Sequence, residues 1–363
     1  MKSTVKKWSK RIIKKAFYAM RAVAWKVAPV QWESWFVRRG YRCHQEICSQ
    51  YGQDVHIFFL RGATGDVYLA NLLLPEYLKK HHIKKYVLVG DPKGLKVIAN
   101  LFGQQNVYAI SRWKASALQC FYKLCGPEQT HITDLFLWQH TMYFNRCRIR
   151  MEERFNFMDT YQYYVFAFDQ PRPLHAPHFP AATEEMKQRW EACGIAEGKT
   201  VIIAPYAYSV TLLPDEMWRN IADGLDKLGY RVVFSLEPGK EKNPAPNYPS
   251  IFFPYAQSVS LLEYAGAFVG LRSGLCDIVS SAHCKMVILY PPSLEKKNYW
   301  EHRSDVAFCG LQSMGLNTMV KEITTPLLQN IELQNQNGVL EDKKVLSNSL
   351  ISQIVQEFRR QDD

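Results

Sequence analysis

Asp66 is the first side chain in the sequence whose type and position point to a ligand site. It ends the run Arg61-Gly62-Ala63-Thr64-Gly65-Asp66, which follows an apolar, β-rich segment and precedes an apolar helix expected over residues 67–78. Gly62 and Gly65 permit a tight turn and let a ligand approach backbone N–H groups at the start of the helix. The turn therefore predicts the floor of a pocket. The alternative to a ligand-binding role is a structural one, in which Asp66 caps that helix and interacts favourably with its dipole.

A second junction of the same kind carries a fixed positive charge. The run Arg272-Ser273-Gly274-Leu275-Cys276-Asp277 follows a strand expected over residues 267–271 and opens a helix. A guanidinium, a turn of small residues and free helical amides together predict a receptor for a diphosphate. The alternative role for Arg272 is an ion pair with Asp277 or Glu263, because arginine forks bind carboxylates as readily as phosphates.

A third junction offers hydroxyl groups between a strand and a helix expected over residues 214–228. Ser209 and Thr211 lie in this loop, where they add phosphate contacts or cap the helix. The glycines near Asp66 do not complete the Gly-x-Gly-x-x-Gly pattern, so a dinucleotide site is not favoured. No Asp-x-Asp motif and no cluster of histidine and carboxylate residues stands out, so no metal is expected. His140 and His283 are interpreted as ordinary residues of the fold.

Short apolar runs alternate with longer amphipathic stretches from about residue 53, which is typical of βα units around parallel sheets. Prolines at 171, 173, 177 and 180 interrupt both helix and strand and predict a linker. We therefore predict an α/β protein with two Rossmann-like domains facing across a cleft. The expected segments are a basic helical segment (1–50), an N-terminal Rossmann-like domain (51–170), a linker (171–194), a C-terminal Rossmann-like domain (195–342) and a closing helix (343–363).

The strand predictions are specific enough to be compared with a structure. The first domain is expected to contain strands at 56–60, 86–89, 107–110 and 163–168. The second is expected to contain strands at 200–205, 231–236, 251–254, 267–271, 286–290 and 306–309.

The excess of positive charge is concentrated at the N-terminus. The chain has 363 residues, 45 Lys and Arg against 34 Asp and Glu, and a formal charge of +11. Residues 1–32 hold nine basic residues and no acid, so the remainder is close to neutral and does not suggest a nucleic-acid-binding body. Apolar side chains recur there every three or four positions, which predicts an amphipathic helix on an anionic membrane surface. The alternative is a helix packed on the body. The residues expected to touch lipid are Lys6, Lys7, Trp8, Lys10, Arg11, Lys14 and Lys15.

The cysteine content and the hydropathy of the sequence indicate the cellular compartment of the protein. Nine cysteines in a long chain without a Cys-x-x-Cys pair favour reduced thiols over a disulfide framework. No uncharged apolar run of 18 residues is present, and the N-terminus is too charged for a signal peptide. A peripheral protein on the cytoplasmic face of a membrane is expected.

Three motifs, in order and at matching spacing over residues 55–310, resemble the bacterial heptosyltransferase family. They are Gly65-Asp66-Val67-Tyr68-Leu69-Ala70, the turn from Pro205 to Ser209 followed by Leu213-Pro214, and Gly270-Leu271-Arg272-Ser273-Gly274. The resemblance implies a GT-B fold and an inverting, metal-independent transfer from a nucleotide-diphosphate sugar bound by the C-terminal domain. It also implies that Asp66 is the base and that Glu241 lies near the family's ribose-binding acid.

The sequence departs from the family pattern at two of these motifs. The family's lysine before its Trp-Pro pair is absent from Val210-Thr211-Leu212-Leu213-Pro214, and its Asp-Ser-Gly or Asp-Thr-Gly is replaced by Arg272-Ser273-Gly274. The arginine restores one positive charge from a different strand end.

The resemblance and the basic helix together predict a glycosyltransferase that extends a membrane-held glycan or glycolipid, such as a lipopolysaccharide or capsule. No cofactor is expected beyond the nucleotide-sugar donor. The alternatives are a nucleotide-sugar epimerase of GT-B type and a scaffold that binds nucleotide sugars or glycans without catalysis.

Overall fold

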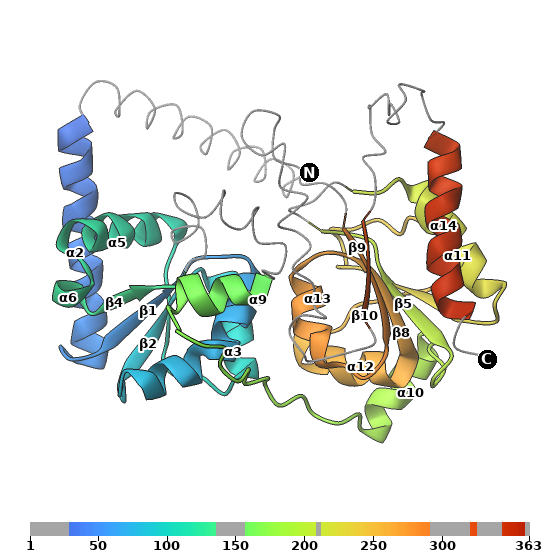
Figure 1. The fold of residues 1–363 in the computed structure, drawn as a ribbon, viewed down its shortest axis with the longest axis horizontal. Helices are drawn as coiled ribbons and strands as arrows, with labels where there is room; N and C mark the ends of the chain where they lie inside the picture. Colours follow the sequence, from blue (N-terminus) through green and yellow to red (C-terminus); the bar gives the residue numbers. More distant parts are fainter. Residues whose placement is uncertain (1–28, 136–156, 208–211, 291–319, 325–342, 360–363) are drawn as a thin grey trace. The chain divides into compact units, whose positions relative to one another are not determined.

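The computed structural model describes residues 29–135, 157–207, 212–290, 320–324 and 343–359 (Figure 1). The segment over residues 1–28, with every residue expected to touch lipid, lies outside the described residues. So do Ser209, Thr211, His140 and the strand expected at 306–309.

The chain divides into two compact units. Of the described residues, the first contains residues 29–61 together with Ile83–Leu95 and Asn106–Asp134. The second contains Gly62–His82, Lys96–Gln105 and the described residues from Leu135 onward. The helix that starts after the first strand is thus grouped with the second unit, while the domain boundaries expected from the sequence remain a prediction.

The first unit is built on a four-stranded parallel sheet in the order β3-β2-β1-β4. Ile57 pairs with Val87 on one side of the central strand and with Ile132 on the other. Burial on both sides of a central parallel strand explains its continuous apolar sequence. The strands are β1 (His56–Leu60), β2 (Tyr86–Gly90), β3 (Val107–Ala109) and β4 (Ile132–Asp134).

Among the described residues, the helices that lie entirely in the first unit are α2 (Pro29–Tyr51), α5 (Arg112–Cys125) and α6 (Pro127–Thr130). Helix α2 packs along α5, and Gly40 allows the close approach because a β-carbon there would collide with the Ala117 carbonyl oxygen. Cys43 and Ile47 of α2 reach the core of the sheet, where the thiol acts as a small apolar filler. Helix α4 (Pro92–Leu101) follows β2.

The second unit is built on a six-stranded parallel sheet in the order β10-β9-β8-β5-β6-β7. Its strands are β5 (Thr200–Ala204), β6 (Arg231–Ser235), β7 (Ser250–Ile251), β8 (Gly266–Leu271), β9 (Lys285–Tyr290) and β10 (Val320–Thr324). In chain order this is the doubly wound 3-2-1-4-5-6 arrangement, and the first sheet has its 3-2-1-4 portion. The predicted α/β class with Rossmann-like sheets is therefore confirmed.

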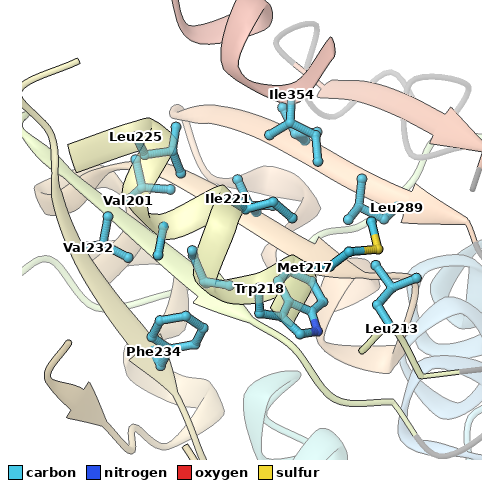
Figure 2. Packing of buried hydrophobic residues seen from close by; sticks show 14 of the residues in the cluster. Val201, Leu213, Met217, Trp218, Ile221, Leu225, Val232, Phe234, Leu289 and Ile354 are labelled. Atoms are coloured by element: carbon cyan, nitrogen blue, oxygen red, sulfur yellow. The ribbon is translucent and has the colours of Figure 1, made fainter. Parts of the chain in front are cut away.

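Two helices, α11 (Asp215–Asp226) and α14 (Lys343–Arg359), cover one face of the second sheet (Figure 1). Trp218 and Ile221 of α11 lie with Ile354 of α14 over Val201 and Leu289, which come from β5 and β9 (Figure 2). These side chains are at most 1% exposed, so they form a dry core between the sheet and the two helices. Helix α14 lies within the segment where the closing helix was expected (343–363).

The remaining elements of the second unit include the helices that carry the candidate site. They are α3 (Thr64–Lys80), α9 (Phe157–Thr160), the π-helical turn η1 (Tyr161–Val165), α10 (Glu184–Ala192), the 3-10 turn η2 (Tyr255–Gln257), α12 (Ser258–Ala265), α13 (Gly274–Ile278) and the 3-10 turn η3 (Val279–Ser281).

The strand predicted at residues 163–168 is wrong. The chain forms the π-helical turn η1 there, closed by a hydrogen bond of 3.0 Å from the Phe166 N–H to the Tyr161 carbonyl. The run is rich in aromatic residues and reads as a strand by composition, but its apolar side chains pack on α3, where the Phe166 ring lies 5.5 Å from that of Tyr77. Tertiary packing therefore overrides the β-propensity.

One other strand prediction needed revision. The strand expected at 251–254 is β7, which ends at Ile251, since Pro254 cannot donate to a ladder. Strands β4 and β10 were not predicted. The proline-rich segment from residue 171 to 180 carries neither helix nor strand, as expected. Among the helices that the structure describes, none combines the length and apolar character needed to cross a membrane.

Candidate active site

The residues of the candidate site lie in two stretches of the second unit, the helix start that follows β1 in the chain and the turn that follows β8. In a doubly wound sheet, ligands bind beyond the carboxyl ends of strands where the strand order reverses. The reversal lies between β1 and β4 in the first sheet and between β5 and β8 in the second. The turn before Asp66 follows β1, and the Arg272 turn follows β8.

Asp66 lies in the first turn of α3 and carries out the capping role. Its Oδ2 accepts a hydrogen bond of 2.8 Å from the backbone N–H of Ala63, the residue that precedes the helix. Gly62 makes this geometry possible, because a β-carbon there would lie 2.6 Å from the Asp66 β-carbon. The carboxylate is thereby folded back over the turn.

The second oxygen of Asp66 has a side-chain donor. The Tyr161 hydroxyl, from η1, donates to Oδ1 at 3.1 Å, and the Tyr161 side chain is fully buried. Burial raises the pKa of the Tyr161 phenol well above its usual range, and the charges of Asp66 and Asp277 add to this shift. Tyr161 therefore stays protonated and acts as a donor.

Arg272 forms a two-bond fork with Asp277. Nη1 donates to Oδ2 at 2.9 Å and Nη2 donates to Oδ1 at 2.6 Å, while Nη1 also donates to the Ser273 carbonyl at 2.6 Å. The arginine side chain is 17% exposed and the aspartate side chain 3%. The ion pair considered for Arg272 as the alternative to phosphate binding is thus present, with Asp277 as its partner. Glu263 instead accepts from the His283 backbone N–H.

Asp277 has an unusual environment for a carboxylate. Burial raises its pKa to about 6, against the lowering effect of Arg272, and the nearby Asp66 charge raises it further. The Asp277 charge also adds to the effect of burial in raising the pKa of Tyr68 in α3. Two carboxylates, one arginine and two tyrosines therefore share one small region of the second unit.

Gly65 and Gly274 allow the starts of α3 and α13 to pack directly on each other. A β-carbon on Gly274 would lie 2.6 Å from the Gly65 backbone nitrogen. A β-carbon on Gly65 would collide with Oδ2 of Asp277 and lie 3.0 Å from the Gly274 α-carbon. These two glycines are required for the close approach that brings Asp66 near the Arg272 fork.

Tyr255 of η2, which was not predicted from the sequence, lies near both Thr64 and Glu241. Burial raises the pKa of Tyr255, the Thr64 side chain lowers it, and the Glu241 charge raises it further. Glu241 itself lies in the loop after β6, where its Oε2 accepts from the Glu237 N–H at 2.7 Å. Burial raises the Glu241 pKa.

The structure thus brings most of the predicted site residues into one unit. The start of α3 contacts the start of α13, which brings together Gly62, Thr64, Gly65 and Asp66 with Arg272, Ser273, Gly274 and Leu275. Glu241 is close enough to Tyr255 for its charge to raise the pKa of that tyrosine. Tyr161 and Tyr255 were not predicted because their partners lie far away in the chain. The one available signal for Tyr161 was the density of aromatic residues after residue 160, which indicated a strand instead.

Two other features do not coincide with this site. In the described part of the chain, no group of three or more His, Cys, Asp or Glu side chains is arranged to hold a metal ion. An open pocket of about 470 Å³ is lined by residues such as Asp223, Arg231 and Tyr248. It lies at the amino end of β6, and it contains none of the predicted site residues, so we do not assign it to the candidate reaction.

Comparisons with known proteins place the fold. No family model and no curated protein matches the sequence. Among solved structures, a glycosyl transferase of family 9 from Veillonella parvula is similar with a TM-score of 0.50 and 14% identity, over 83% of this chain and 97% of that chain.

Two Escherichia coli structures give lower scores. ADP-heptose LPS heptosyltransferase II has a TM-score of 0.45 and 13% identity, over 84% of this chain and 99% of that one. Heptosyltransferase WaaC with ADP has a TM-score of 0.45 and 11% identity, over 82% and 99%. The two Rossmann-like sheets and the match over nearly the whole Veillonella parvula protein show that this chain has the fold of a family 9 glycosyltransferase.

Proposed function

We propose that the protein is a glycosyltransferase that moves a sugar from a nucleotide-diphosphate donor to a hydroxyl group of a glycan or glycolipid. The observation that carries the proposal is the meeting of Asp66, which follows β1, with the Arg272 turn, which follows β8. A group transfer between two substrates needs a proton acceptor and an anion receptor at one place. The fold shared with a family 9 glycosyltransferase supports the same assignment.

In the proposed reaction, Asp66 takes the proton of the acceptor hydroxyl. The acceptor oxygen forms a bond to the anomeric carbon, the bond from that carbon to the diphosphate oxygen breaks, and the nucleoside diphosphate leaves with the electron pair. Attack opposite the leaving group inverts the anomeric configuration. No metal ion is assigned a role in this proposal.

Arg272 and the turn behind it receive the developing negative charge of the diphosphate. Arg272 is paired with Asp277, so the pair adds little net charge, and the backbone N–H groups of Ser273, Gly274 and Leu275 supply the remaining donors in the proposal. Glu241, whose loop follows β6, is assigned to the ribose. Ser209 and Thr211 remain proposed phosphate contacts.

We further propose that the acceptor is held at a membrane. The nine basic residues in the first 32 positions provide an attraction to anionic lipid of about 1 kcal/mol per residue near the surface. A protein docked in this way on the cytoplasmic face has access to lipid-linked acceptors and to soluble nucleotide sugars.

A nucleotide screen tests the central proposal. Thermal shifts are measured with ADP, UDP, GDP and CDP, with the matching monophosphates as controls, and each diphosphate sugar is then assayed for release of its diphosphate with and without bacterial glycolipid. Binding of one diphosphate and acceptor-dependent release support a transferase. Binding without turnover indicates a scaffold, and conversion of the sugar without an acceptor indicates an epimerase. No thermal shift with any diphosphate contradicts nucleotide binding altogether.

A further inference from the structure

Tyr161 is a buried polar residue of the candidate site that has no role in the proposed reaction so far. Its side chain is fully buried, and its hydroxyl donates to Oδ1 of Asp66 at 3.1 Å. The two residues are 95 positions apart in the sequence. A hydroxyl placed in a dry region against a carboxylate stabilises a single orientation of that carboxylate.

The backbone at Tyr161 forms a π-helical turn, and this turn positions the Tyr161 hydroxyl against Asp66. The hydrogen bond from the Phe166 N–H to the Tyr161 carbonyl spans five residues, which is the π-helical pattern. Single π-helical turns occur often at functional sites because they change the direction of side chains on a helix. The start of the turn is held by the Arg172 N–H, which donates to Oε1 of Gln162, the residue after Tyr161, at 2.5 Å.

We propose that Tyr161 is a positioning residue for Asp66, whose hydroxyl holds Oδ1 while the Ala63 N–H holds Oδ2, so that the carboxylate is fixed and ionised before an acceptor hydroxyl arrives. The inference rests on the proposed function of Asp66 as the base. A carboxylate offers about four lone-pair positions, so two donors leave capacity to accept the substrate proton.

The direction of the effect follows from elementary electrostatics. A donor that bonds to the charged form of an acid favours that form, so removal of the hydroxyl makes the carboxylate easier to protonate. Burial and the two nearby carboxylates raise the pKa of the phenol itself, so Tyr161 remains a donor and does not compete for the proton. The other groups that act on this region are Asp277 and Arg272, whose fork lies at the start of α13.

The test uses the full chain labelled with carbon-13 at aspartate carboxyl groups. The Asp66 signal is assigned by its loss in Asp66→Asn, and its titration is followed in the parent protein and in Tyr161→Phe. We expect the midpoint of the Asp66 titration in Tyr161→Phe to move to higher pH, because the charged form of the carboxylate loses a hydrogen-bond donor. The Asp277 signal is followed separately, because that carboxyl titrates near pH 6.

Tyr248→Phe is a matched control. It removes the same kind of contact, a tyrosine hydroxyl that donates to Asp223 Oδ1 at 2.8 Å elsewhere in the second unit. Tyr248→Phe is expected to leave the Asp66 titration unchanged. An unchanged Asp66 midpoint in a folded Tyr161→Phe protein overturns the inference.

A double-mutant cycle separates this inference from the proposed function. With a nucleotide sugar that the screen finds to be turned over, Tyr161→Phe is expected to lower kcat about tenfold and to shift the acid limb of the rate profile to higher pH, whereas in the Asp66→Asn background it should change kcat little. An equal loss of kcat in both backgrounds contradicts action through Asp66. Full turnover in Asp66→Asn contradicts the proposed base, while the titration result still decides the Tyr161 contact.

Discussion

Arg272 and Asp277 form a buried, two-bond ion pair five residues apart, with N–O distances of 2.9 and 2.6 Å. The pair spans the first turn of a five-residue helix and lies where the start of α13 packs on α3. The sequence allowed two roles for Arg272, an ion pair with a carboxylate and the binding of a diphosphate, and the two are compatible. An arginine held by a carboxylate has a fixed orientation, so its exposed edge can bind an anion that approaches it.

Replacing Arg272 by alanine is therefore expected to act on both stability and binding. Loss of one partner leaves the other charge buried, which typically costs about 3–5 kcal/mol in the free energy of unfolding. The double variant Arg272→Ala/Asp277→Asn should recover part of this loss in urea unfolding, because a neutral amide needs no counter-charge. Nucleotide-diphosphate affinity, measured by calorimetry, should be weakened in both variants. Arg272→Lys should restore it only in part, since an ammonium group cannot reproduce the fork. Undiminished affinity in the folded double variant would move the donor site elsewhere.

Asp277 makes stability depend on pH in a direction opposite to that of most acidic residues. Its pKa is raised to about 6 in the folded state from 3.8, so between these values the folded protein binds a proton that the unfolded protein releases. The contribution of this carboxyl to the free energy of unfolding is therefore full below pH 4 and is lost as the pH rises to about 6. Urea unfolding at pH 5 and pH 7 checks this. Asp277→Asn should lack this pH-dependent contribution. The free energy of unfolding of the parent minus that of Asp277→Asn should therefore be larger at pH 5 than at pH 7. An equal difference at both pH values would contradict the shift.

Gly65 is expected to tolerate no side chain. A β-carbon there would collide with Asp277 Oδ2 and approach the Gly274 backbone, which cannot give way as a flexible side chain can. Gly65→Ala should reduce the free energy of unfolding by about 1–3 kcal/mol, as overpacking of a dense interior does. Gly224→Ala is the control, because its β-carbon would meet a methyl group of Val355 at 2.7 Å and the new alanine favours the α11 helix. A smaller loss in Gly65→Ala than in Gly224→Ala would contradict the tight packing of α3 on α13.

Residues 1–28 are expected to bind anionic lipid. Deletion of this segment should release the protein from phosphatidylglycerol vesicles in a sedimentation assay, since the basic residues and aromatic side chains of the segment are lost together. A full-length variant with Lys7, Lys10 and Lys14 replaced by glutamine should show an intermediate loss that is greatest at low salt. Neutral phosphatidylcholine vesicles serve as the lipid control. Equal sedimentation of the deleted and full-length proteins would exclude the segment as the docking element.

The parts of the fold that the sequence predicted well are those with a simple burial pattern. Strands β1 and β8 lie at the centre of parallel sheets and are buried on both faces, so their continuous apolar runs are unambiguous. Strand β4 has three residues and carries Asp134 at its end, which leaves too short a pattern to recognise. The π-helical turn η1 was mistaken for a strand because the composition of a short aromatic run does not show which element it packs against.

In the candidate site too, the residues marked by a local sequence pattern were predicted, and those that meet only through tertiary structure were not. Asp66 and Arg272 were predicted because a strand, a turn with glycine and a helix start are adjacent in the sequence and mark a ligand-binding edge. Tyr161 meets Asp66 only through tertiary structure, and no local pattern reports a contact across 95 positions. The Asp277 partner of Arg272 was among the predicted alternatives because it lies within the same turn of helix.

Asp66→Asn distinguishes a cap from a base. Asparagine keeps one carboxamide oxygen as an acceptor for the Ala63 N–H or the Tyr161 hydroxyl, so the free energy of unfolding should fall by no more than about 1 kcal/mol. Asparagine cannot take a proton from an acceptor hydroxyl, and a positioned base typically contributes about 100- to 10,000-fold in rate. We therefore expect a folded protein with nearly unchanged affinity for the nucleotide sugar and at least a ~100-fold lower kcat. Calorimetry with the donor and release of the diphosphate measure the two quantities separately. Near-normal kcat would leave Asp66 with the capping role alone, because its two observed hydrogen bonds already account for its place at the start of α3.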